Sequence, residues 1–163
     1  MIVLFEGIVM CFVLLLVCVV GIANDGPVGL VTFYEKDVQR RVVELGLVSE
    51  EQIRRQTIAA GMAVLLPMMV LVPLMVFGVN GAQGFWSSFR QMTVISLIAG
   101  LFDRLFIDWW WVEHTNAWVI PGTEDLRPYI HKRTLVNKWV GTLIAFPVYY
   151  ALLAWIIVSV LEL

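Results

Sequence analysis

Charged side chains are scarce in this chain, since Asp, Glu, Lys and Arg make up only 15% of its 163 residues. The net charge is -2, and no segment forms a basic domain. Nucleic-acid-binding proteins normally carry a concentrated patch of Lys and Arg, so we expect no nucleic-acid partner. Hydrophobic residues make up 60% of the sequence and the mean hydropathy is +0.85, which indicates an integral membrane protein.

Cysteine and histidine are also rare, with two of each. Cys11 and Cys18 are seven residues apart on an expected helix. This spacing is about 10.5 Å at 1.5 Å per residue, too far for a disulfide. No CxxC motif or Cys/His cluster is present, so structural zinc, iron–sulfur clusters and thiol–disulfide chemistry have no support. We expect no cofactor.

Four apolar runs are long enough to cross a hydrocarbon core of about 30 Å, which takes roughly 20 helical residues. They comprise residues 2–23, 57–79, 91–111 and 135–161. The first run lacks a basic n-region and is longer than the apolar part of a signal peptide, so we predict a retained helix. The sequence predicts an all-α, polytopic membrane protein with four transmembrane helices, forming one integral-membrane domain over residues 1–163.

Basic residues are distributed unevenly among the connections between these runs. Most of them fall in the first and third connections, whereas residues 78–89 of the second contain no Lys or Arg. By the positive-inside rule, the first and third connections are cytoplasmic and both termini lie outside. We therefore predict an N-out/C-out, multi-pass protein of the cell (inner) membrane.

The first connection has the pattern of an amphipathic helix over residues 31–45, with apolar residues at three- and four-residue steps and charges on the other faces. Gly46 suits the left-handed position that ends a helix. Ser49 and Gln52 form a capping box that starts the next one. We predict a cytoplasmic amphipathic helical hairpin. Two interpretations are open: a helix on the surface of the cytoplasmic leaflet, or a docking surface or lid over the third membrane helix.

The third apolar run carries three charged residues, Asp103, Arg104 and Asp108, in its cytoplasmic half. An ionisable residue at a helix centre costs about 2.5–3.5 kcal/mol on translocon scales, so such residues usually face protein or water and often mark a site. Arg104 and Asp108 are one turn apart and can form an ion pair. Asp103 points about 100° away from Arg104, and Lys138 on the fourth run is its expected partner. One interpretation is an ion pair that only stabilises the bundle.

Residues 112–134 are predicted to form an ordered cytoplasmic loop, because Pro121 and Gly122 mark a turn. His114 and His131 lie in this loop without a recognised metal-ligand spacing, so we predict no metal site. Three consecutive tryptophans end the third run, and at least one of them must face inward. The candidate ligand-binding residues are Asp103, Arg104, Asp108, Trp111, Asn137 and Lys138. The candidate catalytic residues are Asp103, Asp108, His114 and His131.

Three functions fit this pattern. The first is binding or translocation of a small polar or amphipathic anion, held by Arg104 and Lys138. The second is an enzyme embedded in the membrane that performs acid–base chemistry on a lipid or isoprenoid. The third is an accessory or scaffold subunit of a membrane complex. The expected partners are membrane lipids, an anionic small molecule, and either a second copy of this chain or another membrane subunit.

Overall fold

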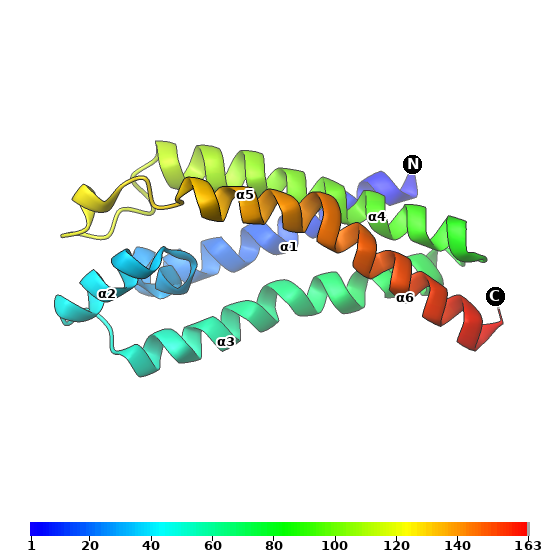
Figure 1. Cartoon of the computed structure of the whole chain (residues 1–163), viewed down its shortest axis with the longest axis horizontal. Helices are drawn as coiled ribbons and strands as arrows, with labels where there is room; N and C mark the ends of the chain where they lie inside the picture. The colour runs from blue at the N-terminus through cyan, green and yellow to red at the C-terminus, as the bar shows by residue number, and fades with distance from the viewer. Residues whose placement is uncertain (163) are drawn as a thin grey trace.

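The computed structural model describes residues 1–162, which form helices and connecting turns without strands (Figure 1). Leu163, the last residue of the predicted domain, lies outside the described residues. The first half contains α1 (Ile2–Asp25), the 3-10 helix η1 (Gly26–Phe33), α2 (Lys36–Glu44), α3 (Glu50–Leu66), and the π-helical η2 (Pro67–Leu71) and η3 (Leu74–Val79). The second half contains α4 (Phe85–Phe102), the π-helical η4 (Asp103–Val112), the 3-10 helix η5 (Glu124–Leu126), α5 (Lys132–Val140), the π-helical η6 (Gly141–Ala145) and α6 (Phe146–Leu161).

Three of these helical stretches are long and apolar enough to cross a membrane. They comprise Ile2–Phe33, Glu50–Val79 and Lys132–Val160. The all-helical class is confirmed, and the three stretches fit an integral membrane protein. The helix through α4 and η4 is also continuous, but it differs in composition because it contains Arg90, Asp103, Arg104 and Asp108.

The helix α4 lies between α1 and α6 and packs against both. Glycines allow the close approach of the backbones. A Cβ atom at Gly7 of α1 would lie 2.7 Å from the Ile98 side chain of α4, and one at Gly100 of α4 would lie 2.5 Å from Thr142 of η6. Small residues at such crossings are typical of membrane helices.

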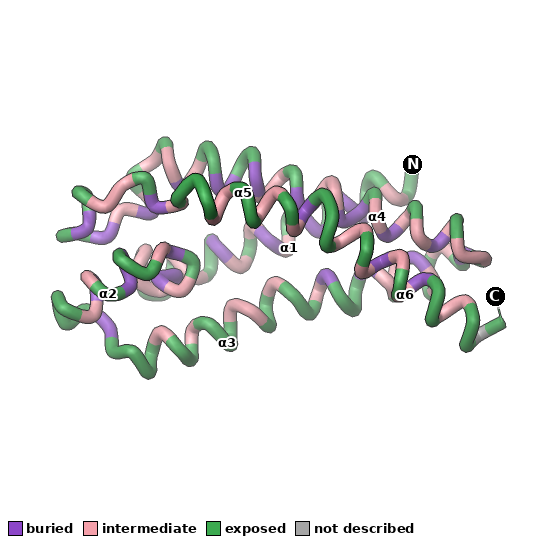
Figure 2. Tube along the Cα trace, viewed as in Figure 1, coloured by how far each residue is buried: buried purple, intermediate pink, exposed green. Residues whose placement is uncertain are grey.

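The helix α3 is covered much less than its neighbours. None of its residues is buried, and Figure 2 shows α3 as exposed and intermediate along its length. It packs on η1, η2 and α1, with at most isolated contacts to α5 and η4. A large part of its apolar surface therefore faces away from the protein.

Four segments of the long helices are π-helical. Three of them, η2, η3 and η6, lie next to Pro67, Pro73 or Pro147, where the missing N–H interrupts the regular hydrogen bonding. The 10-residue segment η4 contains no proline. It coincides instead with the charged residues of the third run. Because π-helical turns are rare and frequently occur at functional sites, η4 is a candidate part of a functional site.

The amphipathic helix is shorter than predicted, and part of its apolar face packs against protein. Residues 31–33 belong to η1, Tyr34 is extended, and α2 begins at Lys36. On the apolar face of α2, Val38 and Val42 are fully buried in protein, whereas Leu45 at its C-terminal end is 48% exposed. Arg41 of α2 pairs with Asp125 at 3.3 Å. Val38 and Val42 therefore contact protein, and α2 covers the 112–134 connection.

The boundary between the two helices of the hairpin agrees with the sequence signals. Gly46 follows α2 with a φ of +70°, in the left-handed region that favours glycine. The Ser49 hydroxyl accepts a hydrogen bond from Gln52 N–H at 3.2 Å, and the Gln52 side chain accepts one from Ser49 N–H at 2.8 Å. The predicted capping box is confirmed.

Candidate functional site

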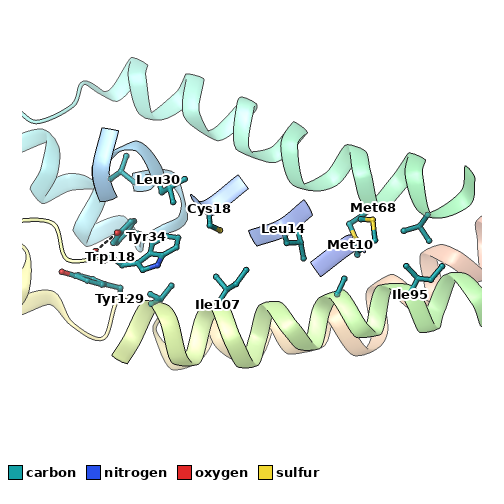
Figure 3. Close-up of a cluster of buried hydrophobic side chains, with 14 of the residues drawn as sticks. Met10, Leu14, Cys18, Leu30, Tyr34, Met68, Ile95, Ile107, Trp118 and Tyr129 are labelled. Carbon is teal, nitrogen blue, oxygen red and sulfur yellow. Dashed lines mark hydrogen bonds between the residues drawn. The ribbon is translucent and has the colours of Figure 1, made fainter. Parts of the chain in front are cut away.

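A cavity of about 210 Å³ lies between α1, α3, η4, α5 and the 112–134 connection. Most of its lining is apolar. Leu14 and Cys18 of α1 and Ile107 of η4 point into the same space (Figure 3). Four charged side chains also line it, namely Asp103, Arg104, Asp108 and Lys138. The cavity is therefore amphipathic, with an apolar wall and a charged wall. We call it the charged cavity.

Asp108 is the centre of the charged wall. Arg104 Nη1 lies 2.8 Å from Asp108 Oδ2, and Lys138 Nζ donates a hydrogen bond to Asp108 Oδ1 at 2.7 Å. Arg104 also pairs through Nη2 with Asp103. The side chains of Arg104 and Asp108 are 9% and 5% exposed, whereas those of Asp103 and Lys138 are 27% and 30% exposed. Two carboxylates thus balance two cations, and Asp103 is the more accessible carboxylate.

The predicted pair of Arg104 and Asp108 is present, but the predicted partner of Asp103 is wrong. Lys138 binds Asp108, and Asp103 pairs with the adjacent Arg104. The long guanidinium side chain can reach the carboxylates on both sides of it. Asp103 therefore needs no partner from the fourth run. Lys138 of α5 contacts Oδ1 of Asp108, and Arg104 contacts Oδ2 of the same carboxylate.

Two buried donors of the charged cavity, Nε of Arg104 and Nε1 of Trp118, have no partner among the described residues. Nη1 of Arg104 and Oδ2 of Asp108 make no aligned hydrogen bond, but they lie 2.8 Å apart and form an ion pair. A buried donor without an acceptor costs about 1–3 kcal/mol. The lining thus offers more donors than the protein itself satisfies.

An aromatic cover closes the charged cavity on the side of α2. It consists of Tyr34, Trp118 and Tyr129, and the Tyr34 hydroxyl donates a hydrogen bond to the Trp118 carbonyl at 2.6 Å (Figure 3). The ring centroids of Tyr34 and Tyr129 are 5.1 Å apart. Burial, with a smaller contribution from Tyr129, raises the pKa of Tyr34 far above its ordinary value, so its hydroxyl remains a donor. The hairpin thus contributes to the cover through Tyr34.

Other predicted site residues lie outside the cavity lining. Trp111 packs edge-on against Trp118 with centroids 5.5 Å apart, so it supports the aromatic cover from behind. Asn137 is exposed on α5. His114 is exposed, with Nδ1 2.6 Å from the Trp109 carbonyl oxygen. The site residues that we did not predict include Tyr34, Trp118, Tyr129 and the apolar wall from α1, α3 and η4. Most of these residues reach the cavity only through tertiary packing.

His131 belongs to the contact between the 112–134 connection and α2. Its N–H donates to Glu35 Oε1 at 3.1 Å, and its Nε2 lies 3.6 Å from Asp37. The structure thus brings neither histidine to the carboxylates of η4. Among residues 1–162, no group of three or more His, Cys, Asp or Glu side chains is placed to hold a metal ion.

Comparison with known families, curated proteins and solved structures finds no match to this chain.

Proposed function

We propose that this protein binds a small amphipathic anion in the charged cavity, as a step in holding or translocating it. The unpartnered donors of Arg104 and Trp118 are the observation that carries this proposal. Charge-assisted hydrogen bonds from Arg to a carboxylate or phosphate are among the strongest in proteins. An anionic head group would supply the acceptors that these donors lack.

The apolar wall accounts for the rest of the ligand. A hydrocarbon segment would lie against Leu14, Val64 and Ile107, all of which line the cavity. On binding, the anion replaces Asp103 as a partner of Arg104, because Asp103 is the more exposed of the two carboxylates. Asp108 keeps its contacts with Arg104 and Lys138. Because the histidines lie elsewhere, the geometry gives the acid–base alternative less support than binding.

We also propose that the continuous helix of α4 and η4 is a fourth transmembrane span in an N-out/C-out arrangement. It lies beside α1 and α6 in the bundle, and its charged residues face the cavity. Both termini lie at one end of the bundle, and α2 lies at the other (Figure 1). An even number of spans places the termini together. The basic residues of the hairpin then put the covered end of the cavity on the cytosolic side.

Labelling of single cysteines tests the orientation. In a background without Cys11 and Cys18, a cysteine at Arg40 should react with a membrane-impermeant maleimide only from the cytosol. A cysteine at Gln83 should react only from outside. Both positions are exposed, so reactivity depends on the side of the membrane. The reverse pattern refutes the orientation, and labelling of both positions from the same side shows that Glu50–Val79 does not cross the membrane.

Titration with decyl phosphate, followed by native mass spectrometry in maltoside micelles, tests the binding proposal. We expect one decyl phosphate per chain, bound more tightly than decanol because only the phosphate offers negatively charged acceptors to the donors. Trp118→Phe removes the indole N–H and should weaken this binding about tenfold. Trp86→Phe is the control, because Trp86 is exposed and lies outside the cavity lining. Equal binding of decyl phosphate and decanol to the wild type would refute the proposal.

A further inference from the structure

A second, partly buried polar cluster lies far from the charged cavity, where α1 begins and η3 ends. The side chain of Glu6 accepts a hydrogen bond at Oε2 from Asn80 Nδ2, at 3.0 Å. Asn80 Nδ2 also donates to Gln91 Oε1 at 2.8 Å, and Gln91 Nε2 donates to Ser87 Oγ at 3.2 Å. Glu6 is only 4% exposed. The cluster joins α1, the turn after η3 and α4.

The atoms left without a partner in this cluster are hydrogen-bond acceptors, whereas those in the charged cavity are donors. Glu6 Oε1 and Asn80 Oδ1 are both buried and have no hydrogen-bond partner. Within residues 1–162, no Lys, Arg, His or terminal amino nitrogen lies within ion-pairing distance of Glu6. Arg90, the neighbour of Gln91, donates its Nε to the Trp86 carbonyl and is exposed. Glu6 is thus a buried carboxylate without a protein counter-charge.

An ionised Glu6 at this position would need a positive charge beside it. An ionised carboxylate that is buried and unpaired carries a large desolvation penalty. The C-terminal end of η3, which Asn80 follows directly, adds partial negative charge from its terminal carbonyl groups. Carboxylate, amide and helix-end carbonyl oxygens are the ligands that hard cations prefer.

The number of carboxylates selects the charge of the cation. Glu6 supplies one negative charge to the cluster, whereas Asn80 and Gln91 are neutral. No group of three or more acidic, His or Cys side chains is available in the described part of the chain. We propose that Glu6 and Asn80, at the end of η3, form a binding site for a monovalent alkali cation such as Na⁺. This site is independent of the anion proposed for the charged cavity.

Thermal unfolding of the full chain in maltoside micelles tests this site. The melting temperature of the wild type should rise by several degrees, and saturate, when NaCl replaces choline chloride at constant ionic strength, because a ligand that binds the folded state stabilises it. Glu6→Gln keeps the side-chain shape and should abolish the response to Na⁺. Glu51→Gln is the matched control, since Glu51 is exposed in α3 and pairs only with Arg55, and it should keep the full response.

Three results would overturn the proposal: a wild-type melting temperature that is equal in the two salts, a Na⁺ response that persists in Glu6→Gln, or a Glu6-dependent response to pH without one to Na⁺. A second variant tests the site if Glu6→Gln does not fold. Asn80→Asp adds a second carboxylate, so Ca²⁺ should stabilise this variant and not the wild type. Failure of Ca²⁺ to stabilise Asn80→Asp would also contradict a cation site.

Discussion

Replacing Asp108 with asparagine is expected to lower the free energy of unfolding by about 3–5 kcal/mol, as when one partner of a buried ion pair is removed. The Asp108 side chain is 5% exposed and contacts both cations of the charged cavity. Asparagine keeps the shape but not the charge. Arg104 would then retain only Asp103, and Lys138 would lose its single ion-pair partner among the described residues. Chemical unfolding in mixed micelles, followed by circular dichroism, measures the change.

The same substitution at two other aspartates provides the comparison for this result. Asp125→Asn should change the free energy of unfolding by only about 0–1 kcal/mol, because Asp125 forms a largely exposed pair with Arg41. Asp103→Asn should have a smaller effect than Asp108→Asn, because Arg104 keeps Asp108. Equal stabilities of Asp108→Asn and the wild type would show that the charges do not form a buried network.

Replacing Arg104 with lysine is expected to weaken decyl phosphate binding by about 100-fold or more. Nε and the Nη2 group that Asp103 vacates are both lost as donors, and each charge-assisted hydrogen bond contributes about 1.5–3 kcal/mol. Lysine preserves the charge beside Asp103 and Asp108 but not the planar fork of donors. Asp103→Asn should have the opposite effect and tighten binding, since Asp103 competes with the ligand for Arg104. Native mass spectrometry of both variants over a decyl phosphate titration measures the two changes.

Arg90→Lys is the control, because it makes the same change from Arg to Lys at a position outside the charged cavity. Arg90 is exposed and lies outside the lining of the charged cavity, so its replacement should leave binding unchanged. Equal weakening by Arg90→Lys and Arg104→Lys would indicate a general electrostatic effect. Tighter binding by Arg104→Lys, or weaker binding by Asp103→Asn, would contradict the exchange of Asp103 for the ligand.

Local features of this fold could be predicted from the sequence. The capping box at Ser49, the glycine turn at Gly46 and the Arg104–Asp108 pair all depend on residues within five positions of one another. Helical periodicity and the stereochemistry of turns determine such contacts, so a sequence pattern is sufficient to find them. The apolar runs likewise predicted the long helices.

Contacts between distant residues could not be predicted in this way. The aromatic cover depends on Tyr34 and Trp118, which are 84 positions apart, and the direction in which Lys138 approaches depends on how α5 packs. The π-helical geometry of η4 has no proline to signal it. Glu6 had a visible signal, because it is an acidic residue inside an apolar run and the argument made for Asp103 applies to it equally. Its partner Asn80, 74 positions away, could not have been assigned.

A crystal structure grown from a lipidic mesophase that contains decyl phosphate would test the central claim most directly. The account predicts density for a phosphate group within hydrogen-bonding distance of Arg104 Nε and Trp118 Nε1, with its hydrocarbon chain against Leu14 and Ile107. Asp103 should have moved away from Arg104, while Asp108 still contacts Lys138. A closed, ligand-free cavity in which Arg104 remains paired with both aspartates would contradict the binding proposal and favour a scaffold role.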